Sequence, residues 1–137
     1  MNASLYQTLP AVALVGFLAA GVIILFRRGE TTMRGGWIAP AALALLFLGW
    51  SSFTVLREGP LGFWPEHVRD AWGNQIWFDL LLSIGIGFAL LVPRARTVGM
   101  RPVPWFIFIL CTGSVGLLAM LARFMFLSEH GTARTGQ

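Results

Sequence analysis

One carboxylate stands inside an otherwise apolar stretch of the chain. Asp79 lies near the front of the run NQIWFDLLLSIGIGFALL, which covers residues 74–91. Residues four apart share one face of an α-helix. The stripe through Asp79 therefore consists of polar or small residues, namely Gln75, Asp79, Ser83 and Gly87. Because an ionisable side chain in such a segment normally faces protein or water and has a partner, the sequence predicts a second charged group close to Asp79.

The predicted partner is Arg123, near the end of the last apolar run. A second stripe of small and polar residues leads to it, namely Thr112, Gly116, Ala119 and Arg123. If its helix runs antiparallel to the helix of Asp79, both charges lie about one turn below the same membrane surface, and the small residues let the two backbones approach. We therefore predict an Asp79–Arg123 ion pair.

Two interpretations of this ion pair stay open. It is a structural clasp between two helices, or it is a binding site for a proton, an ion or a polar headgroup. Hydroxyls in a neighbouring run could extend the cluster, although helix-borne Ser and Thr more often bond their own i−4 carbonyl. The candidate polar cluster, which contains no catalytic residue, is Asp79, Arg123, Gln75, Ser83 and Ser52.

The other reactive side chains form no known catalytic or metal-binding motif. Cys111 is the only cysteine in the sequence, so an intramolecular disulfide and a CxxC motif are both excluded. His67 and His130 lack a suitably spaced third ligand for zinc or copper, and we expect them to be solvent-exposed. The sequence therefore predicts no metal site and no cofactor.

The composition indicates a membrane protein. Of 137 residues, 56% are hydrophobic and 12% are charged, whereas soluble domains carry about 25% charged residues. Four apolar runs are each long enough to cross a hydrocarbon core of about 30 Å at about 1.5 Å per residue. We predict a single membrane domain with transmembrane helices over about 9–26, 37–56, 75–92 and 103–127 and a short interfacial helix over about 65–72.

Charges are distributed unevenly between the connections. Residues 27–36 and 93–102 hold six arginines and one glutamate, a net charge of +5. Residues 57–74, Asp79 and the stretch from Arg123 onward hold four arginines and five acids, a net charge of −1. Because arginine-rich short loops stay in the cytoplasm, we predict an all-α fold, a four-helix transmembrane bundle with both termini on the outer, periplasmic side. The arginines form no basic stripe, so nucleic acid is not an expected partner.

Three features occur together in residues 74–123: an aspartate early in one helix, a basic corner followed by tryptophan, and a glycine-rich helix that ends in Leu-x-Arg. In this chain they are Asp79, the segment from Arg94 to Trp105, and Leu121-Ala122-Arg123. With these features the chain resembles a family of small bacterial membrane proteins known only as a domain of unknown function. The resemblance implies a multi-pass protein of the bacterial inner (cytoplasmic) membrane with Asp79 and Arg123 in its signature, and it implies no activity.

From these features we expect a non-catalytic accessory or scaffold subunit of a membrane complex, and not an enzyme. The expected partners are the lipid bilayer and other membrane-protein subunits or a second copy of the chain. The alternative is a small oligomeric transporter or channel that uses Asp79 as its coupling carboxylate, although Asp79 is close to the surface for a midplane site. An enzyme acting on a lipid or isoprenoid is a third hypothesis, with only one acid and one base to work with.

Overall fold

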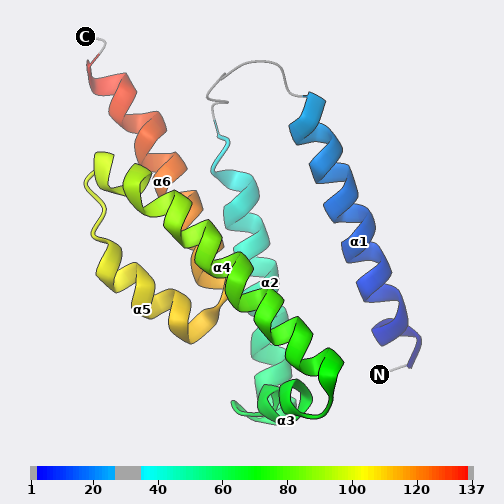
Figure 1. The fold of residues 1–137 in the computed structure, drawn as a ribbon. Coiled ribbons are helices and arrows are strands. Elements are labelled where there is room, and N and C mark those ends of the chain that lie inside the picture. Colours follow the sequence, from blue (N-terminus) through cyan, green and yellow to red (C-terminus); the bar gives the residue numbers. More distant parts are fainter. Residues whose placement is uncertain (1–2, 27–34, 136–137) are drawn as a thin grey trace. The chain divides into compact units, whose positions relative to one another are not determined.

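The computed structural model describes residues 3–26 and 35–135, and the secondary-structure elements of these residues are all helices (Figure 1). The all-α class expected from the sequence is thereby confirmed. The chain divides into two compact units, residues 1–31 and 32–137. The first unit contributes one described helix, α1, and the second contributes five, α2 to α6.

Helix α1 (Ala3–Phe26) is an apolar helix whose residues Thr8–Phe26 are long and apolar enough to cross a membrane. None of the side chains described in this stretch is buried within the unit. The sequence predicted the span over 9–26, and the helix begins earlier. Pro10 therefore lies inside α1, not at its start.

Two further helices of membrane-spanning length belong to the second unit. They are α2 (Ile38–Glu58) and α4 (Ala71–Thr97), and the short helix α3 (Phe63–Val68) lies between them. With α1 they make three candidate spans in the described part of the chain. The ranges predicted from the sequence differ from these at their ends: 37–56 for α2, 75–92 for α4, and 65–72 for the interfacial helix.

Helix α4 is longer than predicted because its first turn is capped and a proline does not stop it. The Asp70 carboxylate accepts a hydrogen bond from the Gly73 N–H at 2.8 Å, which is an N-cap contact. The sequence predicted that Pro93 ends the run, but the helix continues to Thr97. Pro93 lacks the backbone N–H that would continue the hydrogen-bond pattern of the helix. Beyond it, the Thr97 hydroxyl donates to the Arg94 carbonyl oxygen at 2.7 Å in the last turn.

The prediction of one helix over 103–127 is wrong. Helix α5 (Pro102–Thr112) ends at Gly113, and α6 (Ser114–Thr135) begins on the other side of this residue. Gly113 has φ +60° and ψ −127°, a conformation that glycine reaches without the steric penalty of a Cβ. The two helices pack against each other as a hairpin (Figure 1). The 11 residues of α5 make about 16 Å, which is about half of a hydrocarbon core.

This reversal brings the end of α6 back to the start of α2. The Gly35 N–H contacts the carboxylate of Glu129, and the ring of Trp37 packs on Phe126. Gly35 and Glu129 belong to segments that the sequence predicted on opposite sides of the membrane, and the structure brings these two residues together. The four-helix bundle with both termini outside is not confirmed.

Helix α6 is the centre of the second unit, because it packs against α2, α4 and α5. Met120 of α6 is fully buried and joins Leu91 of α4 and Ile109 of α5 in one apolar cluster. Helix α4 approaches α6 closely at Gly87, where a Cβ atom would lie 2.8 Å from Leu117 Cδ2.

Replacing Gly113 with alanine is expected to lower the free energy of unfolding by about 1–3 kcal/mol, because a Cβ is disfavoured in this backbone conformation. The control Gly85→Ala adds the same methyl group at a helical position with nothing within 4 Å. It should be neutral or stabilising by about 1 kcal/mol. Thermal unfolding of the full chain in detergent measures both variants, and equal stability of the two would show that the chain does not turn at Gly113.

Candidate functional site

Three residues of the predicted stripe, Gln75, Asp79 and Ser83, lie on one side of α4 and are exposed, whereas the fourth, Gly87, is half-buried against Leu117 of α6. The opposite side of α4 packs against the rest of the second unit with buried or half-buried residues: Trp77, Leu80, Ile84, Phe88, Leu91 and Ala95. At about 100° per residue, Asp79 lies about 140° around the axis from the centre of that packed side. We call the exposed side the Asp79 face, made of Gln75, Asp79, Leu82, Ser83, Ile86 and Leu90.

The predicted ion pair between Asp79 and Arg123 is wrong. Arg69 forms ion pairs with Glu66 at 2.6 Å and with Asp70 at 3.3 Å, and no ion pair joins Asp79 to Arg123 among the described residues. The guanidinium carbon of Arg123 lies 5.9 Å from the centroid of the Phe126 ring instead. Asp79 and Arg123 are both exposed.

The turn at Gly113 explains why this prediction fails. Leu117 of α6 packs at the level of Gly87, halfway along α4. From there α6 runs towards Gly35, so Arg123 lies six residues beyond Leu117 in that direction. Asp79 lies eight residues before Gly87 in the other direction. The two charges are therefore about 20 Å apart along the helix axes.

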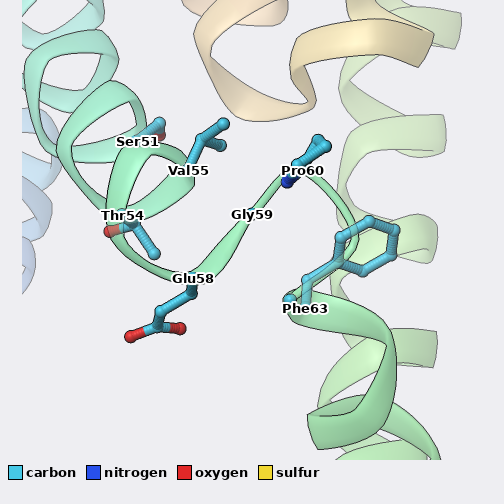
Figure 2. A pocket seen from close by; sticks show the side chains of 8 residues that line it. Ser51, Thr54, Val55, Glu58, Gly59, Pro60 and Phe63 are labelled. Carbon is cyan, nitrogen blue, oxygen red and sulfur yellow. The ribbon is translucent and has the colours of Figure 1, made fainter.

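Ser52 is exposed on α2 and does not join Asp79 either. A cavity of about 180 Å³ opens at the same end of α2, next to the start of α3 (Figure 2). The Thr54 hydroxyl donates to the Trp50 carbonyl oxygen at 3.0 Å, the i−4 bond expected from the sequence. The residues that line the cavity are Ser51, Thr54, Val55, Glu58, Gly59, Pro60, Gly62 and Phe63, and Asp79 is not among them.

The sequence did not predict the contact that Glu129 makes with the start of α2. The Gly35 N–H donates to both carboxylate oxygens of Glu129, at 2.9 and 3.0 Å. Gly35 in turn accepts a hydrogen bond from the Ile38 N–H at 3.0 Å, in the turn that opens α2. A negative charge next to a helix N-terminus is also favoured by the helix dipole. Glu129 therefore fastens the α5–α6 hairpin to α2.

Aromatic rings pack around this contact. Trp37 meets Phe126 edge to face, with 5.4 Å between the ring centroids, and Phe126 stacks on His130 at 4.1 Å. Arg123, Phe126 and His130 follow one another at spacings of three and four residues, so they share one face of α6. The sequence shows the three- and four-residue spacing on α6, but it does not show that the turn at Gly113 brings this face to the start of α2.

At the other end of the second unit, Asp70 and its neighbours join α3 to α4. The Asn74 side-chain amide donates to the His67 carbonyl oxygen at 2.8 Å, across the junction. The pKa of Asp70 is lowered from 3.8, chiefly because the Gly73 N–H hydrogen-bonds to the carboxylate, and the Arg69 guanidinium lowers it further. The ionised carboxylate is thus the form that caps α4.

The two histidines pack against aromatic rings. His67 is half-buried, where the sequence predicted solvent exposure, because it packs edge-on to Trp77 with 4.7 Å between the ring centroids. Its Nδ1 lies 2.6 Å from the Phe63 carbonyl oxygen, and Nδ1 of His130 lies 2.8 Å from that of Phe126. Among the residues that the structure describes, no three His, Cys, Asp or Glu side chains are grouped to hold a metal ion.

In comparisons with known proteins, no protein-family model, curated protein or solved structure matches this chain. The resemblance of residues 74–123 to a domain of unknown function therefore stays a prediction. A function for this chain has to be inferred from its own geometry, above all from the Asp79 face and the Glu129 contact.

Replacing Glu129 with alanine is expected to lower the free energy of unfolding by about 1–3 kcal/mol, because it removes a charged acceptor from the Gly35 N–H. Glu129→Gln keeps one acceptor oxygen and should lose less. The control Glu66→Gln breaks an exposed pair with Arg69 and should cost less than about 1 kcal/mol. Unfolding in detergent measures all three variants. If Glu129→Ala unfolds like the parent chain, the contact does not hold the hairpin.

Proposed function

We propose that this chain is a non-catalytic subunit of a membrane complex and that the Asp79 face is its contact with another transmembrane helix. One observation carries this proposal. A carboxylate and an amide, Asp79 and Gln75, lie in a candidate span on the side of α4 that faces away from the rest of the second unit.

Asp79 has apolar neighbours on the exposed side of α4. Phe78, Leu82 and Ile86 are 55%, 65% and 60% exposed. The 27 residues of α4 make about 40 Å, which exceeds a hydrocarbon core of about 30 Å. Asp79 lies about 12 Å from the start of α4, so it falls inside the core near one boundary. Charged side chains at such a depth normally face protein or water, and a further helix packed on α4 would cover Asp79.

The transporter alternative gains no comparable support. A coupling carboxylate would have to line a path for the solute, and Asp79 is not one of the residues that line the cavity beside α2 and α3. The position of Asp79 on the exposed side of α4 favours contact with another helix.

We also propose a membrane topology of three spans, α1, α2 and α4, followed by a re-entrant α5–α6 hairpin. Residues 27–36, 93–102 and 123–137 together hold eight arginines and two glutamates, whereas residues 57–79 hold two arginines and four acids. The positive-inside rule then favours the cytoplasm for the end that contains Gly35 and Glu129. The C-terminus is thus proposed to be cytoplasmic, in contrast to the topology expected from the sequence.

Single cysteines test this topology in a Cys111→Ser background. Leu61→Cys, beside α3, is expected to react with a membrane-impermeant maleimide in intact cells, because it lies at the acidic end. Gly131→Cys, near the end of α6, should react only after the membrane is opened. Labelling of Gly131→Cys in intact cells would contradict the re-entrant hairpin.

A photo-crosslinking residue at position 86, on the Asp79 face, tests the proposed function in native membranes. It is expected to form protein adducts that are lost in the Asp79→Leu background, because the polar contact is then missing. The control is position 110 on α5, where Leu110 is 74% exposed and no polar side chain of the Asp79 face is near in sequence. If position 86 gives only the lipid adducts that position 110 gives, the proposal is wrong.

A further inference from the structure

We infer that the open end of the α5–α6 hairpin binds one anionic phospholipid, whose phosphate lies between Arg101 and Arg123 and whose acyl chains lie against α5. This inference goes beyond the proposed subunit role and does not involve the Asp79 face. It rests on the proposed re-entrant topology, which puts the start of α5 at the cytoplasmic boundary of the hydrocarbon core.

The packing of the hairpin puts the two arginines at one level. A Cβ atom at Gly116 of α6 would lie 2.8 Å from the Cα atom of Ile109 of α5, so the two backbones approach most closely there. Pro102 lies seven residues before Ile109, and Arg123 lies seven residues after Gly116. Because the two helices of a hairpin are antiparallel, both residues lie about 10 Å from this contact in the same direction. Arg101 directly precedes Pro102, at the open end of the hairpin.

Arg123 lies on the side of α6 that faces α5. Seven residues beyond Gly116, the helix has returned to within about 20° of the same direction, at about 100° per residue. Arg123 is nevertheless exposed, because α5 begins at this level and extends no further. Packed helix axes lie about 8–10 Å apart, a separation that two arginine side chains from facing helices can bridge. The guanidinium groups of Arg101 and Arg123 can therefore reach one phosphate at the membrane boundary.

No described carboxylate neutralises these two arginines. Among the described residues, neither Arg101 nor Arg123 takes part in an ion pair. Glu129, the acid that follows Arg123 on α6, lies about 120° around the axis from it and accepts a hydrogen bond from the Gly35 N–H. Helix α1 has no charged residue between Ala3 and Phe26, so it supplies no counter-charge wherever it packs. The two positive charges therefore favour an anion from outside the described chain.

The length of α5 favours a phospholipid as the source of that anion. Its 11 residues make about 16 Å, the thickness of one leaflet of a hydrocarbon core of about 30 Å. Along this length Val103, Ile107 and Leu110 are 69%, 56% and 74% exposed. In the proposed topology acyl chains lie beside these side chains, and the phosphates of the same lipids lie at the level of Arg101 and Arg123. A guanidinium group binds a phosphate through two parallel hydrogen bonds, and basic groups at the cytoplasmic surface attract anionic lipids.

Lipid binding by the full chain in mild detergent tests the two arginines, with phosphatidylglycerol and phosphatidylcholine as probes and native mass spectrometry as the measurement. The parent chain is expected to retain one phosphatidylglycerol with a preference of about fivefold or more over phosphatidylcholine. Arg101→Gln and Arg123→Gln should each weaken the binding of phosphatidylglycerol about fivefold, as expected for the loss of one cation near the membrane surface. Equal binding of the two lipids by the parent chain would overturn the inference.

The matched control is Arg96→Gln, which removes the same charge at the same end of the second unit. Arg96 lies nine residues after Gly87, on the opposite side of α4 from the contact with α6, so this variant should bind phosphatidylglycerol as the parent does. If Arg96→Gln weakens binding as much as Arg123→Gln, the attraction is a diffuse effect of net charge and the inference is wrong. Displacement of the lipid by inorganic phosphate would also overturn it, because the acyl chains would then contribute nothing.

A photoactivatable phosphatidylglycerol with a diazirine in one acyl chain tests the position of the lipid in vesicles that contain the full chain. Its adducts are expected within residues 102–112, and Arg123→Gln should lower their yield about fivefold. Arg96→Gln should leave the yield unchanged. Adducts confined to residues 8–26 would show that the lipid does not lie against α5, and would reject the inference.

The labelling of Gly131→Cys separates a failure of the lipid site from a failure of the proposed topology. If Gly131→Cys is protected in intact cells and the parent chain shows no preference for phosphatidylglycerol, only the lipid site is rejected. If Gly131→Cys reacts in intact cells, the re-entrant hairpin and the lipid site are both rejected.

Discussion

The reversal of the chain at Gly113 is the constraint on which the arrangement of the second unit depends. It ends α5 after 11 residues and sends α6 back alongside both α2 and α4. Backbone groups at such a turn cannot be left facing lipid, and here the turn packs within the unit, with Ile84 of α4 as its neighbour. The far end of α6 is then fastened to the start of α2 by the contact between Glu129 and Gly35. The conformation of Gly113 and the carboxylate of Glu129 thus favour the packing of α6 against α2, α4 and α5.

The helices themselves could be predicted from the sequence, whereas this turn could not. Apolar runs of membrane-spanning length indicate α1, α2 and α4, because length and composition alone decide whether a helix suits the bilayer. The run over 103–127 has the same composition, yet it breaks. Gly85, Gly87 and Gly116 sit inside helices and look no different in the sequence from Gly113. What distinguishes Gly113 is its positive φ, at the turn where α5 folds back on α6.

For the candidate site, too, the sequence predicts which residues share a helix face but not which elements pack against that face. Helical periodicity grouped Gln75, Asp79 and Ser83 on one exposed side of a single helix, but its fourth residue, Gly87, packs against α6. Which side faces the protein, and which charge faces Asp79, are properties of the tertiary fold. The ion pair with Arg123 required a continuous last helix, so it failed together with that helix. Glu129 was missed for the same reason, because the stretch from Arg123 onward was expected at the opposite end.

The two acidic residues Asp79 and Glu129 illustrate two ways in which a small membrane protein satisfies a carboxylate. Glu129 is half-buried and bonds a backbone N–H of its own chain, so its contribution belongs to folding. Asp79 is exposed on the side of α4 opposite the packed residues, where we propose that it contacts another helix. A substitution of Asp79 is expected to leave the apolar cluster around Met120 undisturbed, because α4 reaches that cluster through Leu91 on its other side.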